Sequence, residues 1–108
     1  METVYHEAIC REFVRNSLPF RSEVPVAITY KGDLLSTTYR ADLICFGEVL
    51  VELKALPAVG KIEKAQILNY LKVSNMMRGL LLNFGGPSLE YKRFIHSAVQ
   101  ERPARFPG

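Results

Sequence analysis

Residues 49–55 constrain the fold of this chain most, because they begin as an extended segment that is apolar on both faces. Such a strand lies in the middle of a sheet that is covered on both sides. Two earlier segments are rich in Val, Ile, Thr and Tyr, and turn signals at residues 31–33 and Gly47 separate them from each other and from residues 49–55. The sequence therefore predicts a strand at residues 23–30, a second strand that follows the turn at residues 31–33 and runs to about residue 46, and a third at residues 49–55.

Two helices are expected to flank these strands. The first spans residues 2–16, where the apolar residues Tyr5, Ile9 and Phe13 recur one turn apart. Glu2 lies at the start of the same stripe. The second spans residues 61–75 and leads into a buried strand at residues 79–84. Residues 89–95 permit an edge strand or a short helix, and we favour the strand.

The length of 108 residues is typical of one domain. With 48% hydrophobic and 23% charged residues, the composition is that of an ordinary globular protein. A chain of this length and composition needs no metal or disulfide to stabilise its fold. We expect a single domain over residues 1–97. Residues 98–108 contain two prolines and two arginines and little apolar surface, so we expect a frayed tail there.

Cysteine usage and hydropathy favour a cytoplasmic protein. Cys10 and Cys45 lie in apolar stretches without a CxxC partner, as is typical of a reducing compartment. The apolar stretches are much shorter than the roughly 20 residues that span a bilayer. The N-terminus also lacks the basic start and apolar run of a secretory signal, so we expect no membrane association.

Charge is distributed unevenly along the chain. Residues 1–53 carry five Lys and Arg against eight Asp and Glu, whereas residues 54–108 carry nine basic residues against three acidic ones. One half therefore suits a cation and the other a polyanion such as nucleic acid. Two solvated faces of opposite charge explain the same pattern equally well.

Three residues on two neighbouring strands are the candidates for chemistry. Glu52 and Lys54 project to one face because side chains alternate along a strand. If residues 46–48 form a three-residue hairpin loop, Asp42 lies directly opposite Glu52 on that face, whereas a two-residue loop would separate them. Two such close carboxylates repel each other unless a cation lies between them, and Mg²⁺ typically takes one or two protein carboxylates.

Each of these assignments has an alternative. Asp42 and Glu52 would also be neutralised by a cross-strand salt-bridge cluster with Arg40 and Lys54. In the second helix, Gln66 and Tyr70 lie on a line with apolar Ile62 and Val73, so we expect Gln66 to point inward to the carboxylates and their water, or else to cap loop carbonyls. Glu2 would reach the same place as an outer ligand, or would only favour the helix dipole.

The order of these motifs resembles that of the PD-(D/E)XK nuclease superfamily, and their amino-acid sequences resemble those of its GxxExxY group. The resemblance covers residues 2 to about 95. The glycine that opens that group's motif would fall before Met1, and Ala41 replaces the proline before Asp42. The matching segments are Glu2-Thr-Val-Tyr5-His-Glu-Ala8, Arg40-Ala-Asp42-Leu, Val51-Glu-Leu-Lys54-Ala, Gln66-Ile-Leu-Asn-Tyr70-Leu-Lys and Gly79-Leu-Leu-Leu-Asn83-Phe-Gly85.

The resemblance implies an α/β (α+β) restriction-endonuclease-like core, a mixed central sheet flanked by helices in the order αβββαβ. It implies Asp42, Glu52 and the Leu53 carbonyl as metal ligands and Lys54 as the catalytic lysine. Gln66 and Tyr70 match its QxxxY helix signature, and Glu2 matches its helix glutamate.

We therefore expect a nuclease that uses Mg²⁺, with Mn²⁺ as substitute, and acts on nucleic acid, DNA in the first instance. Lys92 and Arg93 are expected to contact backbone phosphates. The rival hypothesis is a catalytically silent module that binds nucleic acid or a partner, and a third is a purely structural salt-bridged domain. A domain this small cannot encircle a duplex, so processive action requires a homodimer or larger assembly. His6 is expected to face solvent, and neither His6 nor His96 is expected to enter the site, which argues against zinc.

Overall fold

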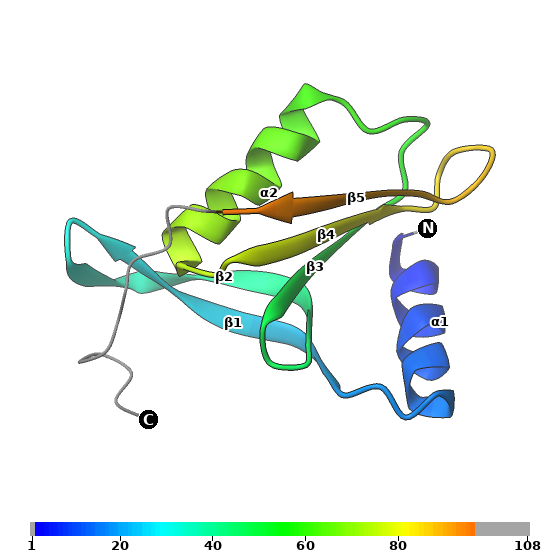
Figure 1. Ribbon diagram of the computed structural model, residues 1–108, viewed down its shortest axis with the longest axis horizontal. Helices are drawn as coiled ribbons and strands as arrows, with labels where there is room; N and C mark the ends of the chain where they lie inside the picture. The colour runs from blue at the N-terminus through cyan, green and yellow to red at the C-terminus, as the bar shows by residue number, and fades with distance from the viewer. Residues whose placement is uncertain (1, 97–108) are drawn as a thin grey trace.

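The computed structural model describes residues 2–96, which form two helices and five strands (Figure 1). The tail expected at residues 98–108 lies outside the described residues. The first strand begins three residues earlier than predicted, and residues 89–95 contain the favoured strand rather than a helix. In chain order the elements are α1 (Glu2–Arg15), β1 (Phe20–Tyr30), β2 (Asp33–Cys45), β3 (Val49–Lys54), α2 (Lys61–Ser74), β4 (Arg78–Asn83) and β5 (Glu90–Ile95).

The five strands form one mixed sheet in the order β1-β2-β3-β4-β5. Neighbouring strands are antiparallel except β3 and β4, which run parallel and are joined through α2. A parallel pair needs such a crossover, because a tight turn only connects antiparallel strands. β3 is the central strand, as its two apolar faces predicted, and the expected α+β fold class with a mixed sheet is confirmed.

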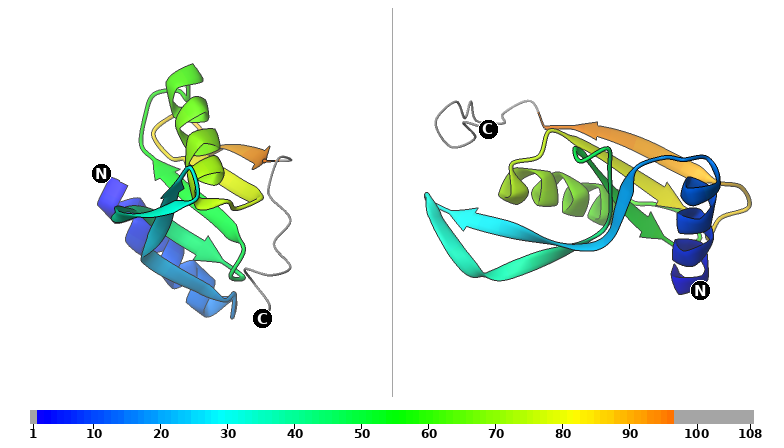
Figure 2. Two further views of the ribbon diagram at one scale, coloured as in Figure 1. Left: turned by 90° about the vertical axis from the view of Figure 1, so that its left-hand side faces the viewer. Right: turned by 90° about the horizontal axis from the view of Figure 1, so that it is seen from below.

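The two helices cover opposite faces of this sheet (Figure 2). Apolar side chains beneath α2 form a cluster that we call the α2 core, and those beneath α1 form the α1 core. The α2 core contains Val24, Ala41, Ile44, Leu50, Val59, Ile67, Leu71 and Leu81. The α1 core contains Leu43, Cys45, Val51 and Leu53, against which Ile9, Cys10, Phe13 and Phe20 pack. No helix within residues 2–96 is long and apolar enough to cross a membrane.

Strands β1 and β2 reverse their faces at one point. In β2, Ala41 belongs to the α2 core and Leu43 to the α1 core, although residues two apart in a regular strand share a face. In β1, Phe20 packs on the α1 core and Val24 lies in the α2 core, although they are four apart. Both reversals occur where Glu23 faces Asp42.

The backbone is irregular at this reversal. Ser22 pairs with Leu43 and Val24 pairs with Ala41. Glu23 and Asp42, which lie between these two pairs, are not paired in the ladder. Glu23 has a φ of 51°, in the left-handed region that a residue with a Cβ rarely adopts. The middle of the hairpin, with Val24, Val26, Tyr39 and Ala41, therefore packs under α2 and its base packs under α1, with Asp42 at the change.

Candidate metal centre

The hairpin between β2 and β3 sets the register of the two candidate carboxylates. Phe46 and Gly47 have φ angles of 56° and 72°, and the N–H of Glu48 donates to the carbonyl of Cys45, which closes a loop of three residues. Leu43 pairs with Val51 and Cys45 with Val49. The three-residue loop is confirmed, and the same register continued by one step sets Asp42 opposite Glu52.

At this step, hydrogen bonds to side chains replace the backbone hydrogen bonds between β2 and β3. The last registered pair of β2 and β3 is Leu43 with Val51. Beyond it, the N–H of Leu53 donates to Oδ2 of Asp42 at 2.8 Å, and the N–H of Asp42 donates to Oε2 of Glu52 at 3.4 Å. Both carboxylates are thus drawn to the point where β2 separates from β3.

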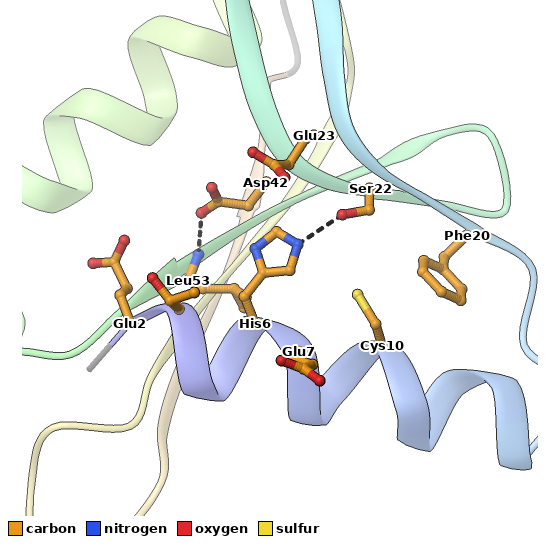
Figure 3. A pocket seen from close by; sticks show the side chains of 10 residues that line it. Glu2, His6, Glu7, Cys10, Phe20, Ser22, Glu23, Asp42 and Leu53 are labelled. Carbon is orange, nitrogen blue, oxygen red and sulfur yellow. Dashed lines mark hydrogen bonds between the residues drawn. The ribbon is translucent and has the colours of Figure 1, made fainter.

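The expectation that both carboxylates project from one face is corrected by the reversal in β2. Asp42 lines a pocket beside α1, together with Glu2 and Leu53 (Figure 3). Glu52 is on the α2 side, where it accepts a hydrogen bond from the hydroxyl of Tyr39. Strict alternation along β2 does not predict this difference, because Glu23 and Asp42 interrupt the regular pleat.

The Leu53 carbonyl faces the same opening. Successive residues of a strand direct their backbone groups to alternate neighbours, and the carbonyl of Lys54 accepts from Phe84 on the β4 side at 2.9 Å. Leu53 therefore directs its carbonyl towards β2, past the end of their ladder. Two carboxylates and a carbonyl are hard oxygen donors of the kind Mg²⁺ takes. Residues 2–96 contain no cluster of three or more His, Cys, Asp and Glu side chains placed to hold an ion.

Glu52 has an unusual protonation equilibrium for a carboxylate. It is only 7% exposed, and its pKa is raised to about 7. Burial is the largest cause of this rise, the hydrogen bond from Tyr39 opposes it, and the nearby charge of Asp42 adds to it. Burial, followed by the contact with Glu52, also raises the pKa of Tyr39. The Tyr39 hydroxyl therefore keeps its proton and acts as a donor to Glu52.

Tyr70 lies beside this pair. Its ring stacks on that of Tyr39, with centroids 3.8 Å apart and planes 19° apart. Burial, and then the charges of Glu52 and Asp42, raise the pKa of Tyr70. The tyrosine of the second helix is thus close to the carboxylates, as its place in the sequence predicted.

Gln66 was expected to point inward to the carboxylates or to cap loop carbonyls, but it is exposed and its described side-chain partner is Lys54. The ammonium of Lys54 donates to Oε1 of Gln66 at 3.2 Å. The predicted line of Ile62 and Gln66 is not the buried face of α2, because Ile62 is 80% exposed and Gln66 is also exposed. Ile67 and Leu71 form that face instead, so the polar residue at 66 lies at its border and reaches Lys54 from the side.

The pocket beside α1 brings together residues that the sequence did not connect. It has a volume of about 600 Å³, and Glu2 lines it as expected of an outer residue of the site. His6 lines it too and is only partly exposed, with Nε2 2.7 Å from the hydroxyl of Ser22 (Figure 3). The expectation that His6 faces solvent away from the site is therefore wrong. It failed because Ser22 comes from β1, which no helical pattern reveals.

The alternative salt-bridge cluster is not found among residues 2–96. The ion pairs described there join other residues, and Lys54 contacts the neutral amide of Gln66. The guanidinium of Arg40 donates to the backbone carbonyl of Glu23. The two carboxylates are thus held by N–H and O–H donors, without a formal ion pair.

Comparison with known proteins identifies the family and the fold. The model of the PD-(D/E)XK nuclease superfamily matches residues 1–94. This chain belongs to the PD-(D/E)XK nuclease superfamily. A search of the curated proteins finds no match. Among solved structures, the chain is similar in fold to the one titled "Crystal structure of SSO0001", with a TM-score of 0.65 and 18% identity. That similarity covers 88% of this chain and 50% of the other, so the chain spans half the length of that structure.

Nucleases of the PD-(D/E)XK superfamily typically use divalent metals and act on nucleic acids. Lys92 and Arg93 lie apart from the candidate site on the edge strand β5. Lys92 pairs with Leu81, which pairs with Glu52, so a buried leucine separates it from the carboxylate. Arg93 pairs with Leu80 and projects to the opposite face from Lys92.

Asn83 supports the segment after Lys54 in this candidate site, a role that the sequence did not suggest although Asn83 lies in one of the matching segments. Its side chain is fully buried at the end of β4, opposite Lys54. Its Oδ1 accepts from the N–H of Leu56 at 2.8 Å and that of Gly85 at 3.2 Å, and its Nδ2 donates to the Leu56 carbonyl at 2.9 Å and to Glu90 at 3.1 Å. A Cβ on Gly85 would overlap the backbone of Ala55 and Leu56. The segment that follows Lys54 is therefore held from both sides.

Proposed function

We propose that this chain is a divalent-metal-dependent nuclease that hydrolyses phosphodiester bonds in nucleic acid. The observation that carries the proposal is the meeting of Asp42 and Glu52 at the end of the β2–β3 ladder, where each accepts a backbone N–H from the other strand. Among residues 2–96 neither carboxylate is in a described ion pair, although the charge of Lys54 is near enough to lower the pKa of Glu52. A bound cation balances the two carboxylates.

Asp42, Glu52 and the Leu53 carbonyl are the residues that would hold the ion. Oδ2 of Asp42 and Oε2 of Glu52 are hydrogen-bonded, whereas Oδ1 and Oε1 accept no described bond within residues 2–96. This set of hard oxygens suits Mg²⁺ and Mn²⁺. When bound, the ion supplies polarisation of the phosphate and activation of water.

Lys54 supplies positive charge next to the reacting phosphate. Gln66 accepts a hydrogen bond from the ammonium and so fixes its direction, which prepares the charge for a phosphorus centre that becomes more negative in the transition state. Glu2, at the rim of the pocket that contains Asp42, acts as an outer residue of the site. Tyr70, with its ring beside Glu52, contacts the substrate.

The finer parts of the proposal rest on the sequence. We assign the chain to the GxxExxY group of the superfamily, and the segments around Glu2, Asp42 and Gln66 support this assignment. We take DNA as the substrate, with Lys92 and Arg93 on β5 meeting phosphates beyond the scissile one from the two faces of the edge strand. Residues 1–97 act as one domain, and processive action requires a homodimer or a larger assembly.

A cleavage assay with and without metal tests the proposal. Supercoiled plasmid, labelled single-stranded DNA and labelled RNA are incubated with the protein in Mg²⁺, Mn²⁺ or chelator. Cleavage of DNA that needs metal, and that Asp42→Asn abolishes, is the expected result. Equal binding of DNA in chelator and in Mg²⁺, with no nick in any substrate, overturns the proposal in favour of a silent binding module.

A further inference from the structure

Tyr39 is bonded to the candidate metal ligand Glu52, yet no motif of the sequence marks it. It lies in β2, three residues before Asp42, on the α2 side of the sheet, where it packs against the α2 core. Its hydroxyl donates to Oε2 of Glu52. The other donor to the same oxygen, the N–H of Asp42, is more distant at 3.4 Å, so Tyr39 is its principal partner.

The Tyr39 ring is itself held in place. Tyr70 stacks on it from α2 with centroids 3.8 Å apart, and the backbone of Tyr39 is paired with that of Val26 in β1. A stacked ring on a paired strand directs its hydroxyl to one point. The partner at that point is a single oxygen of Glu52, and the described bonds leave Oε1 without a donor.

We propose that Tyr39 is a positioning residue that holds Oε2 of Glu52 and thereby presents Oε1 to the divalent ion. The inference rests on the proposed function, because it assumes that Glu52 is a metal ligand. Partners of metal-ligating carboxylates outside the coordination shell orient the ligand, and their loss typically weakens metal binding by about 10- to 100-fold. Tyr39 does not touch the ion or the substrate in this role. It restricts the carboxylate to one rotamer.

The test compares Mn²⁺ affinity with stability. Tyr39→Phe keeps the stacked ring and removes only the hydroxyl, and Tyr30→Phe is the matched control, since Tyr30 lies at the end of β1 and is 60% exposed. Mn²⁺ binding is followed by the loss of the free-ion electron paramagnetic resonance signal. Thermal melts in chelator report the stability of each variant. Tyr39→Phe is expected to weaken Mn²⁺ binding about tenfold, and Tyr30→Phe to leave it unchanged.

A second variant separates positioning from packing. Tyr39→Leu removes the hydroxyl and the stack with Tyr70, so it should lower the melting temperature further than Tyr39→Phe while weakening Mn²⁺ binding at least as much. A Tyr39→Phe protein with a lower melting temperature but wild-type Mn²⁺ affinity would show a merely structural role and overturn the inference. Tighter Mn²⁺ binding by Tyr39→Phe would also overturn it, because the hydroxyl would then compete with the ion.

The two proposals fail in different ways. If the wild type binds no Mn²⁺ at millimolar concentration, the metal-dependent function is overturned and the role of Tyr39 with it. If the wild type binds Mn²⁺ and cleaves DNA while Tyr39→Phe binds the ion equally well, only the role of Tyr39 is lost.

Discussion

Asp42 donates its backbone N–H to the Glu52 carboxylate at 3.4 Å, while its own carboxylate accepts the N–H of Leu53 at 2.8 Å. The two acidic residues thus replace the next rung of the β2–β3 ladder with side-chain bonds. Their charges oppose each other, since Asp42 contributes to the raised pKa of Glu52. The stability of the metal-free protein and its response to metal should both reflect this opposition.

Asp42→Asn should leave the metal-free protein as stable as the wild type or more stable. The amide oxygen of asparagine still accepts the N–H of Leu53, and the repulsion with Glu52 is removed. Thermal melts should show that Mg²⁺ or Mn²⁺ raises the wild-type melting temperature by mass action and that Asp42→Asn abolishes this gain.

The matched control for Asp42→Asn is Asp33→Asn, at the exposed start of β2, which should keep the full metal response. Two results together would show that Asp42 is not a metal ligand. Millimolar Mg²⁺ and Mn²⁺ would leave the melting temperature of the wild type unchanged, and the Asp42→Asn protein would melt at a much lower temperature than the wild type.

Glu52 should make the stability of the metal-free protein depend on pH. Its folded pKa of about 7 lies above the ordinary value of 4.5, so the folded state binds more protons between these values than the unfolded state. Stability therefore falls as pH rises from about 4.5 to about 7, by roughly 3 kcal/mol. Urea denaturation in chelator across this range measures the slope.

Glu52→Gln should remove that slope, because glutamine does not titrate. Glu48→Gln, on the exposed turn between β2 and β3, is the control and should retain it. A slope of equal size in wild type and Glu52→Gln would assign the pH dependence to another group.

Lys54→Ala should separate metal binding from cleavage. Its ammonium contacts the exposed amide of Gln66 rather than a carboxylate, so its loss should change stability by less than about 0.5 kcal/mol and leave the metal-induced gain intact. Cleavage should fall at least about a hundredfold, since charge placed for the transition state is lost. Lys61→Ala, at the exposed start of α2, is the control for loss of a lysine. Loss of the metal response in Lys54→Ala would place the lysine at the ion instead of the phosphate.

The strands and the Asp42–Glu52 register could be predicted from the sequence because they follow from local rules. Turn signals set the loop length, and loop length sets which residues face each other. The central position of β3 followed in the same way from its two apolar faces. These features need no knowledge of distant segments.

The reversal at Glu23 and Asp42 was not predictable from alternation. It depends on which part of the β1–β2 hairpin packs against α2 and which part packs against α1. Glu23 carries no glycine-like signal for its φ of 51°. The contacts of Tyr39 with Glu52 and of His6 with Ser22 join elements that meet only in the folded chain. The prediction of the buried face of α2 was wrong because it relied on Ile62, which is apolar but lies exposed in the first turn of the helix.

Asn83→Ala should destabilise the protein and impair the site without touching it. The asparagine is fully buried, and both its oxygen and its amide make two hydrogen bonds each, three of the four to the backbone of Leu56 and Gly85. Alanine would remove all four hydrogen bonds and leave their partly buried partner groups without Asn83, at a cost of about 3 kcal/mol in the free energy of unfolding. The segment after Lys54 would also lose the contact that fixes its path, so cleavage should fall while Mn²⁺ binding changes little. Urea denaturation and Mn²⁺ titration measure the two effects, with Asn69→Ala on the exposed face of α2 as the control. A cost below about 0.5 kcal/mol, as for an ordinary surface substitution, would mean that water replaces Asn83 and that the segment after Lys54 is positioned by other contacts.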